Sequence, residues 1–261
     1  DPVPRARQII ADITAIFPPT LNQFVVGPMV KIGWGADILT GTVAIVVQFP
    51  AFKIALLGRI QVALPPGEEE SIAILRLDFA GILDVPAKTL SFDGSLDGSR
   101  VAVFTITGDI AMRAAFGDRP DFAMSAGGLY PGYPPPGDFP SLRRLTIALS
   151  NSDNPRLRLE AYFAITPATL QFGGGVEFYY SLDIAVVGFI EIDAAASFDA
   201  LLVFPCTFTA HFNLHVLLRR NHQPFIGVEV DIRMTGAQPI DITGNATLHF
   251  LGTHSIPFHK V

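Results

Sequence analysis

All six histidines of the chain lie after residue 210, and several of them share a strand face with acidic residues. The segments on either side of Arg220–Pro224 alternate apolar and polar residues, which predicts two antiparallel strands joined by a turn. Pairing Leu218 with Ile226 places His215 opposite Glu229. Directly opposed residues have Cβ atoms about 5 Å apart, so a His215–Glu229 hydrogen bond is geometrically reasonable.

The same register places Asn213 opposite Asp231 and His211 opposite Arg233, and a further strand adds His249 to the polar face. Imidazole and carboxylate groups on one face could bind a metal ion. The candidate residues for such a site, or for a metal-assisted hydrolase, are His211, His215, Glu229, Asp231 and His249. The sequence has no HExxH spacing and no G-x-S-x-G motif. We therefore favour an ordinary polar sheet face, with no catalytic residue, metal or cofactor.

The composition predicts an apolar surface that something must cover. Hydrophobic residues make up 49% of the 261-residue chain and charged residues 16%, against about 25% charged in an average globular domain. The cover could be the protein's own core, a partner, a ligand or lipid. The net charge is −6 without a cluster of Lys or Arg, which disfavours nucleic acid as a partner. No segment reaches the ~18 apolar residues of a membrane-spanning helix.

Hydrophobic periodicity predicts a mainly β fold with one helix. Isoleucines at three-to-four spacing before Pro18-Pro19 predict an N-terminal amphipathic helix over about residues 4–16. After about Val30 the chain alternates with period two between short turns, which predicts a large antiparallel meander of roughly a dozen strands. A sheet of this size should curl into a barrel-like or two-layer form. We expect a single domain over residues 1–261, with the long Pro/Gly loop 127–140 as the only candidate boundary.

Four local features lead to further expectations. Gly173 and Gly175 lie on one face of a predicted strand, so a backbone or a bulky side chain should approach closely there, or the strand should bend. The Pro- and Tyr-rich loop is a candidate cover, so the candidate ligand-binding residues are Gly173, Gly175, Tyr130 and Tyr133. Asp97-Gly98 is expected to form a tight hairpin turn. Cys206, the single cysteine, is expected to be a small buried hydrophobic residue.

Several segments together resemble a bacterial family of unknown function, domain of unknown function 6603, over nearly the whole chain. They include GWG (33–35), FTITGDIAMR (104–113), PPPGDFPSLRRLTIALS (134–150), DNPRLRLEAYFAITPATLQFGGGVEFYY (153–180) and GVEVDIRMTG (227–236). Members of the family are found as modules in very large proteins, some encoded near extracellular contractile injection systems. The resemblance implies neighbouring modules or another protein as partners, and a place in the bacterial cytoplasm or in an exported assembly. It implies no catalytic residues.

Two interpretations of function follow. In the first, the chain is a non-catalytic structural or binding module of a larger bacterial protein, which packs against its neighbours or cradles an apolar ligand or lipid. The segment Thr42–Phe49, which is apolar on both sides, favours this interpretation. In the second, the chain is a hydrolase or metal-assisted enzyme that uses the His and acid residues of the C-terminal strands.

Overall fold

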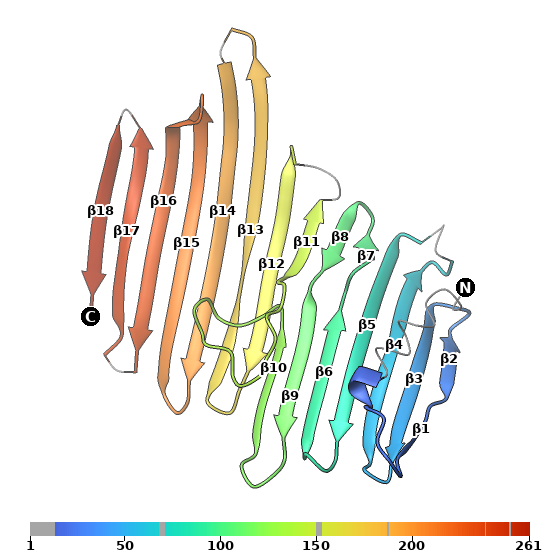
Figure 1. Cartoon of the computed structure of the whole chain (residues 1–261). Helices are drawn as coiled ribbons and strands as arrows, with labels where there is room; N and C mark the ends of the chain where they lie inside the picture. The colour runs from blue at the N-terminus through green and yellow to red at the C-terminus, as the bar shows by residue number, and fades with distance from the viewer. Residues whose placement is uncertain (1–13, 68–70, 150–152, 187, 238, 251) are drawn as a thin grey trace.

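The computed structural model of the chain describes residues 14–67, 71–149, 153–186, 188–237, 239–250 and 252–261. Its 18 strands form one antiparallel sheet (Figure 1). The strands are β1 (Phe24–Val26), β2 (Met29–Trp34), β3 (Leu39–Phe49), β4 (Lys53–Leu64), β5 (Ala73–Asp84), β6 (Thr89–Ser95), β7 (Ser99–Val101), β8 (Phe104–Thr107), β9 (Asp109–Ala115), β10 (Asp121–Ala126), β11 (Leu145–Leu149), β12 (Arg156–Ile165), β13 (Thr169–Ile184), β14 (Gly188–Val203), β15 (Thr207–Arg220), β16 (Gln223–Gly236), β17 (Asp241–Phe250) and β18 (Thr253–Lys260).

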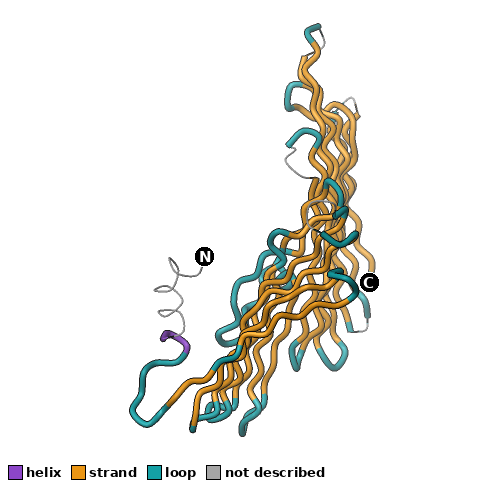
Figure 2. Tube along the Cα trace, turned by 90° about the vertical axis from the view of Figure 1, so that its right-hand side faces the viewer, coloured by secondary structure: helices purple, strands orange, loops and turns teal. Residues whose placement is uncertain are grey.

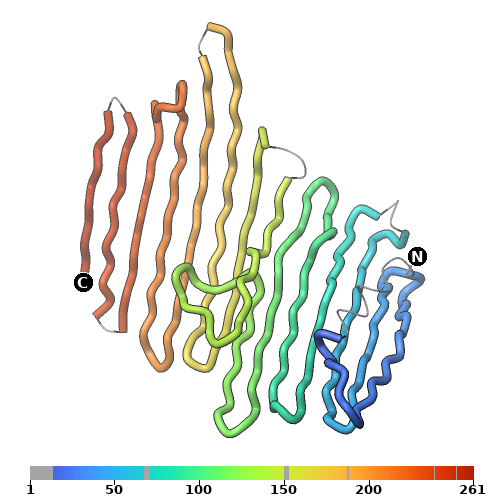
Figure 3. Tube along the Cα trace, in the orientation of Figure 1, coloured from blue at the N-terminus to red at the C-terminus, as the bar shows by residue number. Residues whose placement is uncertain are grey.

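The mainly β, antiparallel meander predicted from the sequence is confirmed. From β12 to β18 each strand pairs with the next one along the chain, and the same holds from β2 to β6. The trace in Figure 3 follows these hairpins, and Figure 2 shows how the sheet twists. Residues 14–16 are helical, and the rest of the helix predicted over about residues 4–16 lies outside the described residues.

The sheet has more strands than the dozen expected because, at several positions across it, two short strands lie end to end in one row where a single long strand was expected. β6 and β7 both pair with β5, β8 and β9 pair with β11 and β10, and these two in turn pair with β12. The pairings therefore close a partial ring of strands within the sheet. The hairpin expected at Asp97-Gly98 is wrong. Gly98 has a φ of +80°, but the chain continues along β5 instead of reversing, so this glycine marks a break within a row.

The two faces of the sheet differ sharply in charge. Following the register from strand to strand places every Asp and Glu of the described strands on the same face, here called the polar face. The opposite face, the apolar face, carries Val, Ile, Leu, Phe, Ala and Gly along almost every row. Its only charged residues within the described strands are Arg220 and Lys260, and each is the last residue of its strand.

The segments that cover the sheet lie on its polar face. Phe17, which follows the helical residues 14–16, is buried against Val46 and Ala55 of β3 and β4. The loop 127–144, which joins β10 to β11, buries Phe139 against Ala111 and Ala123. In Figure 1 the loop crosses the rows around β12, and the N-terminal segment crosses β4 and β5. These two covers form a partial second layer on the side that already carries the charges.

Candidate functional site

The apolar face has large side chains in the open along its whole width. At β13 the exposed fraction is 41% for Val176 and 37% for Phe178, and it is 44% for Val216 at β15. The face also exposes Leu56, Leu75, Phe122, Met124, Ile147, Leu159, Phe163, Phe172, Ile192, Phe198, Ile226, Leu248 and Phe258. Monomeric soluble proteins rarely expose apolar patches beyond a few hundred Å² without a binding role. This face is therefore the main candidate functional site.

The accessible surface of the whole chain leads to the same conclusion. The chain exposes 16207 Å² for a mass of 28.1 kDa. A compact monomer of that mass exposes about 11,000 Å². The excess of roughly 5,000 Å² is comparable to the area buried in a large obligate interface.

The cavities described in the molecule lie away from the apolar face. Those with volumes of about 140 to 520 Å³ lie on the polar face or beneath the loop 127–144. A small-molecule site is normally a concave pocket that surrounds most of its ligand. The apolar face therefore suits a partner with a broad surface better than a small ligand.

On the polar face the charges are paired across neighbouring strands. Arg113 of β9 donates to both carboxylate oxygens of Asp93 on β6, at 3.0 and 3.1 Å. Arg143, in the loop 127–144, contacts Asp109 at 2.6 Å and Asp97 at 3.0 Å. These hydrogen bonds lower the pKa of Asp109. Charges that satisfy one another in this way need no outside partner.

The histidines follow the same pattern of cross-strand pairing. The predicted register is confirmed, because His215 lies opposite Glu229 and Asn213 lies opposite Asp231. The carboxylate that His215 contacts, however, is Asp193 of β14, whose Oδ1 lies 3.1 Å from Nε2. Glu229 instead contacts His249 of β17 at 2.9 Å. The expected His215–Glu229 bond is therefore wrong, since each side chain reaches a strand on its other side.

Two further pairs are separate from these. His211 lies 2.6 Å from Asp231, a hydrogen bond that lowers the pKa of Asp231, and His259 lies 2.8 Å from Asp241. Among the described residues, no three His, Cys, Asp or Glu side chains are grouped so that they could hold a metal ion. The structure thus arranges the candidates His211, His215, Glu229, Asp231 and His249 as pairs.

A buried tyrosine lies above the glycine of β13 that the sequence singles out. A Cβ added to Gly173 would lie 2.6 Å from Cε1 of Tyr162 and 2.8 Å from Oδ1 of Asp199. The hydroxyl of Tyr162 donates to Asp199 at 2.8 Å, and Arg144 lies 3.8 Å above its ring. Burial, followed by the hydrogen bond to Asp199, raises the pKa of Tyr162. The expected close approach is therefore confirmed at Gly173.

The loop 127–144 docks beside this tyrosine. The backbone N–H of Tyr130 donates to Oε1 of the buried Gln171 at 2.8 Å. Gln171 lies on the same face as Gly173 and Gly175, two and four residues before them along β13. Tyr133 is tied to Tyr130 through a backbone hydrogen bond of 2.9 Å. The loop thus reaches the region predicted for it, and a role of these residues in ligand binding stays a prediction.

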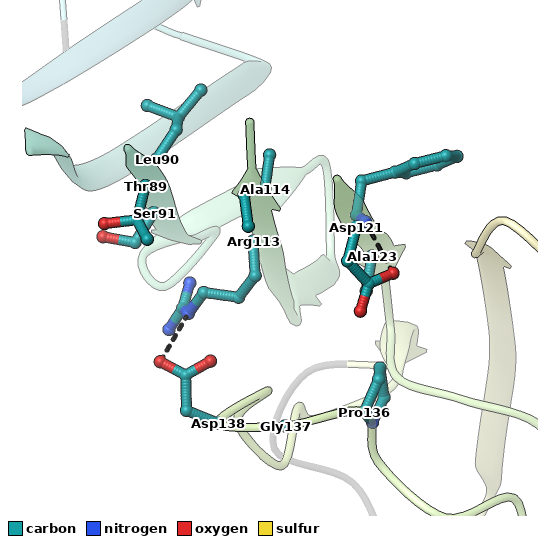
Figure 4. A pocket seen from close by; sticks show the side chains of 12 residues that line it. Thr89, Leu90, Ser91, Arg113, Ala114, Asp121, Ala123, Pro136, Gly137 and Asp138 are labelled. Carbon is teal, nitrogen blue, oxygen red and sulfur yellow. Dashed lines mark hydrogen bonds and ion pairs between the residues drawn. The ribbon is translucent and has the colours of Figure 1, made fainter. Parts of the chain in front are cut away.

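A cavity of about 250 Å³ lies where the loop meets β6, β9 and β10 (Figure 4). Arg113 points into it toward Asp138, at 3.9 Å, with Thr89, Ser91 and Pro136 around it. The guanidinium already donates to Asp93 and to the carbonyls of Phe92 and Met112. Because these groups neutralise and engage it, the cavity is poorly suited to an anion.

Two features of the structure differ from what the sequence led us to expect. Cys206 is exposed, which corrects its prediction as buried, because it lies in the turn between β14 and β15 rather than within a strand. The strong asymmetry between the faces was not predicted, although the sequence contains its signal. Within each predicted strand the acids fall on one parity, and only the register between strands shows that these parities coincide.

These features define an antiparallel β-sheet module with one polar face, on which charges pair across strands, and one apolar face that no described segment covers. The chain belongs to DUF6603, a family of unknown function, whose family model matches residues 1–260. No curated protein and no solved structure gives a significant match to the chain. Within the described residues, no helix is long and apolar enough to cross a membrane.

Proposed function

We propose that the chain is a non-catalytic structural or binding module of a larger bacterial protein, and that it works by burying its apolar face against a second apolar β-sheet. The observation that supports this most directly is the series of exposed apolar side chains, from Leu56 of β4 to Phe258 of β18, on a face with no acidic residue in its described strands. At about 25 cal/mol per Å², burial of even 1,500 Å² would contribute tens of kcal/mol before the entropy cost of association.

A sheet is the partner that best matches this surface. Two sheets pack face to face at about 10 Å with their strands nearly aligned, and they need no pocket. An anionic membrane surface is a poorer match, because the chain has a net charge of −6. The second interpretation, a metal-assisted hydrolase, gains no support from the separate His–acid pairs. The link to injection systems stays a prediction from the family resemblance.

Thiol labelling tests whether this face is covered. It is carried out inside the cells that naturally produce the protein. The test places a cysteine at Val176 on the apolar face, with Cys206 replaced by Ser so that the exposed native thiol does not react. Ser197→Cys is the matched control, because Ser197 lies on β14 next to Ala196, which pairs with Val176, and faces the polar side. We expect labelling at residue 176 to be at least about tenfold slower than at residue 197. Equal rates would show that the face is uncovered and would refute the proposal.

A further inference from the structure

We infer that the sheet which covers the apolar face is a second copy of this chain, packed face to face with the first. This inference rests on the proposed function, and it names the partner. The width of the apolar face favours a second copy as its cover. The exposed apolar side chains run from Leu56 on β4 to Phe258 on β18, and a partner must be equally wide to cover them. A second copy provides a sheet of the same width and the same twist, which is the condition for aligned packing of two sheets.

The near absence of charge on the apolar face allows this face to pair with a copy of itself. A two-fold interface brings the same patch of both subunits together, so any like charges in it would face one another. The apolar face meets this condition, because its charged residues in the described strands, Arg220 and Lys260, lie at strand ends. The polar face does not meet it, since it carries all the acids of those strands. Of the two faces, only the apolar one can therefore be paired with itself at low electrostatic cost.

The edges of the sheet disfavour association by strand pairing. β18 and β2 lie at the two ends in Figure 1, and every residue of both strands is exposed. Pro257 lies inside β18, and Pro28 separates β1 from β2. Proline cannot donate a ladder hydrogen bond, and it is a common device against edge-to-edge pairing of sheets. Association through the face is therefore favoured over extension of the sheet at its edges.

The excess of accessible surface has the size that this arrangement requires. Stacking two copies over much of their width would bury several thousand Å² in total, in the range of obligate homodimers. The excess of roughly 5,000 Å² over a compact monomer is of the same order.

The mass of the purified chain in solution, measured by light scattering across a range of concentrations, tests the inference. We expect twice 28.1 kDa at micromolar concentration. Val176→Lys with Val216→Lys places two charges on the apolar face, and we expect it to raise the dissociation constant by about 100-fold or more, because unpaired charges would be buried. Ser197→Lys with Thr247→Lys is the matched control on the polar face, and it should leave the mass unchanged. Circular dichroism of each variant checks that the sheet still forms.

The outcomes separate this inference from the proposed function. If the chain has the mass of a monomer at all concentrations and residue 176 is labelled slowly in the cell, the inference of a second copy is refuted but the proposal of a covered face is not. If native mass spectrometry finds a lipid bound to such a monomer, both the inference and the proposed function are refuted. A double-mass species that is insensitive to the Val176 and Val216 changes would place the interface elsewhere and would also refute the inference. A double mass that is lost only in the apolar-face variant supports it.

Discussion

At the scale of single residues, the contact between Gly173 and Tyr162 shows how tightly the polar face is packed. A Cβ at residue 173 would lie 2.5 Å from the backbone oxygen of Phe198, which cannot rotate away. We expect Gly173→Ala to lower the free energy of unfolding by about 2–3 kcal/mol, measured by urea denaturation. Gly33→Ala is the control, because the nearest heavy atom to its added Cβ is 3.8 Å away. An equal loss in both variants would contradict the role assigned to this packing.

The acids of the polar face make a second prediction at this scale, on pH. Hydrogen bonds from Arg143 and from His211 lower the pKa of Asp109 and of Asp231 below the usual 3.8. An acid with a depressed pKa in the folded state stabilises the protein above its unfolded pKa, and this contribution is lost as the pH falls through the folded value. We therefore expect the free energy of unfolding to decrease below about pH 4.

The variant Asp109→Asn tests the contribution of one of these acids. Part of the decrease below pH 4 should disappear in this variant, and the size should be modest because the Arg143 side chain is 54% exposed. Asp118→Asn provides a control, since the side chain of Asp118 is fully exposed. A pH profile of Asp109→Asn that follows the wild type would argue against this assignment.

At the scale of elements, the loop 127–144 packs its most buried side chain, Phe139, against the sheet, with an exposed fraction of 5%. Removing a buried phenylalanine ring costs about 3–5 kcal/mol. Because the loop lies outside the hydrogen-bonded strands, we expect Phe139→Ala to act locally and to increase proteolysis and hydrogen exchange within residues 127–144. Asp138→Ala changes the neighbouring, 90% exposed side chain and should leave the loop protected. A uniform destabilisation of all strands would instead show that the loop is part of the global folding unit.

The elements also show which parts of the fold can be predicted from sequence. The β15–β16 register follows from alternation around one turn, because slipping by one residue would move Leu218 and Ile226 to the polar face. The partner of His215 does not follow, since its side chain can reach a carboxylate on either neighbouring strand and only the geometry of three strands selects Asp193. Glycine is ambiguous in the same way. Gly98 would suit a reversal of the chain as well as the break within a row that it makes.

At the scale of the whole molecule, the candidate site differs from a pocket because it is a property of the entire sheet. Its existence could be expected from the 16% of charged residues, which is too few to cover both faces of so large a sheet. Its location required the register across all strands, since each strand taken alone shows only that one of its sides is apolar. Among the described residues, both covers, Phe17 and the loop with Phe139, lie on the polar face, so they leave the apolar face open.

The Tm of the whole molecule should depend on protein concentration. If two copies bury their apolar faces against each other, unfolding separates them, and stability then depends on protein concentration. A 100-fold increase in concentration stabilises a dimer by about 2.7 kcal/mol, shared between two chains, which corresponds to a rise in Tm of about 3 °C for chains of this size. At concentrations below its raised dissociation constant, the Val176→Lys, Val216→Lys variant is a monomer, so the same increase should leave its Tm unchanged. Calorimetry at two concentrations of each protein measures both values. A concentration-independent Tm in the wild type would mean that the apolar face is not buried between copies at the point of unfolding.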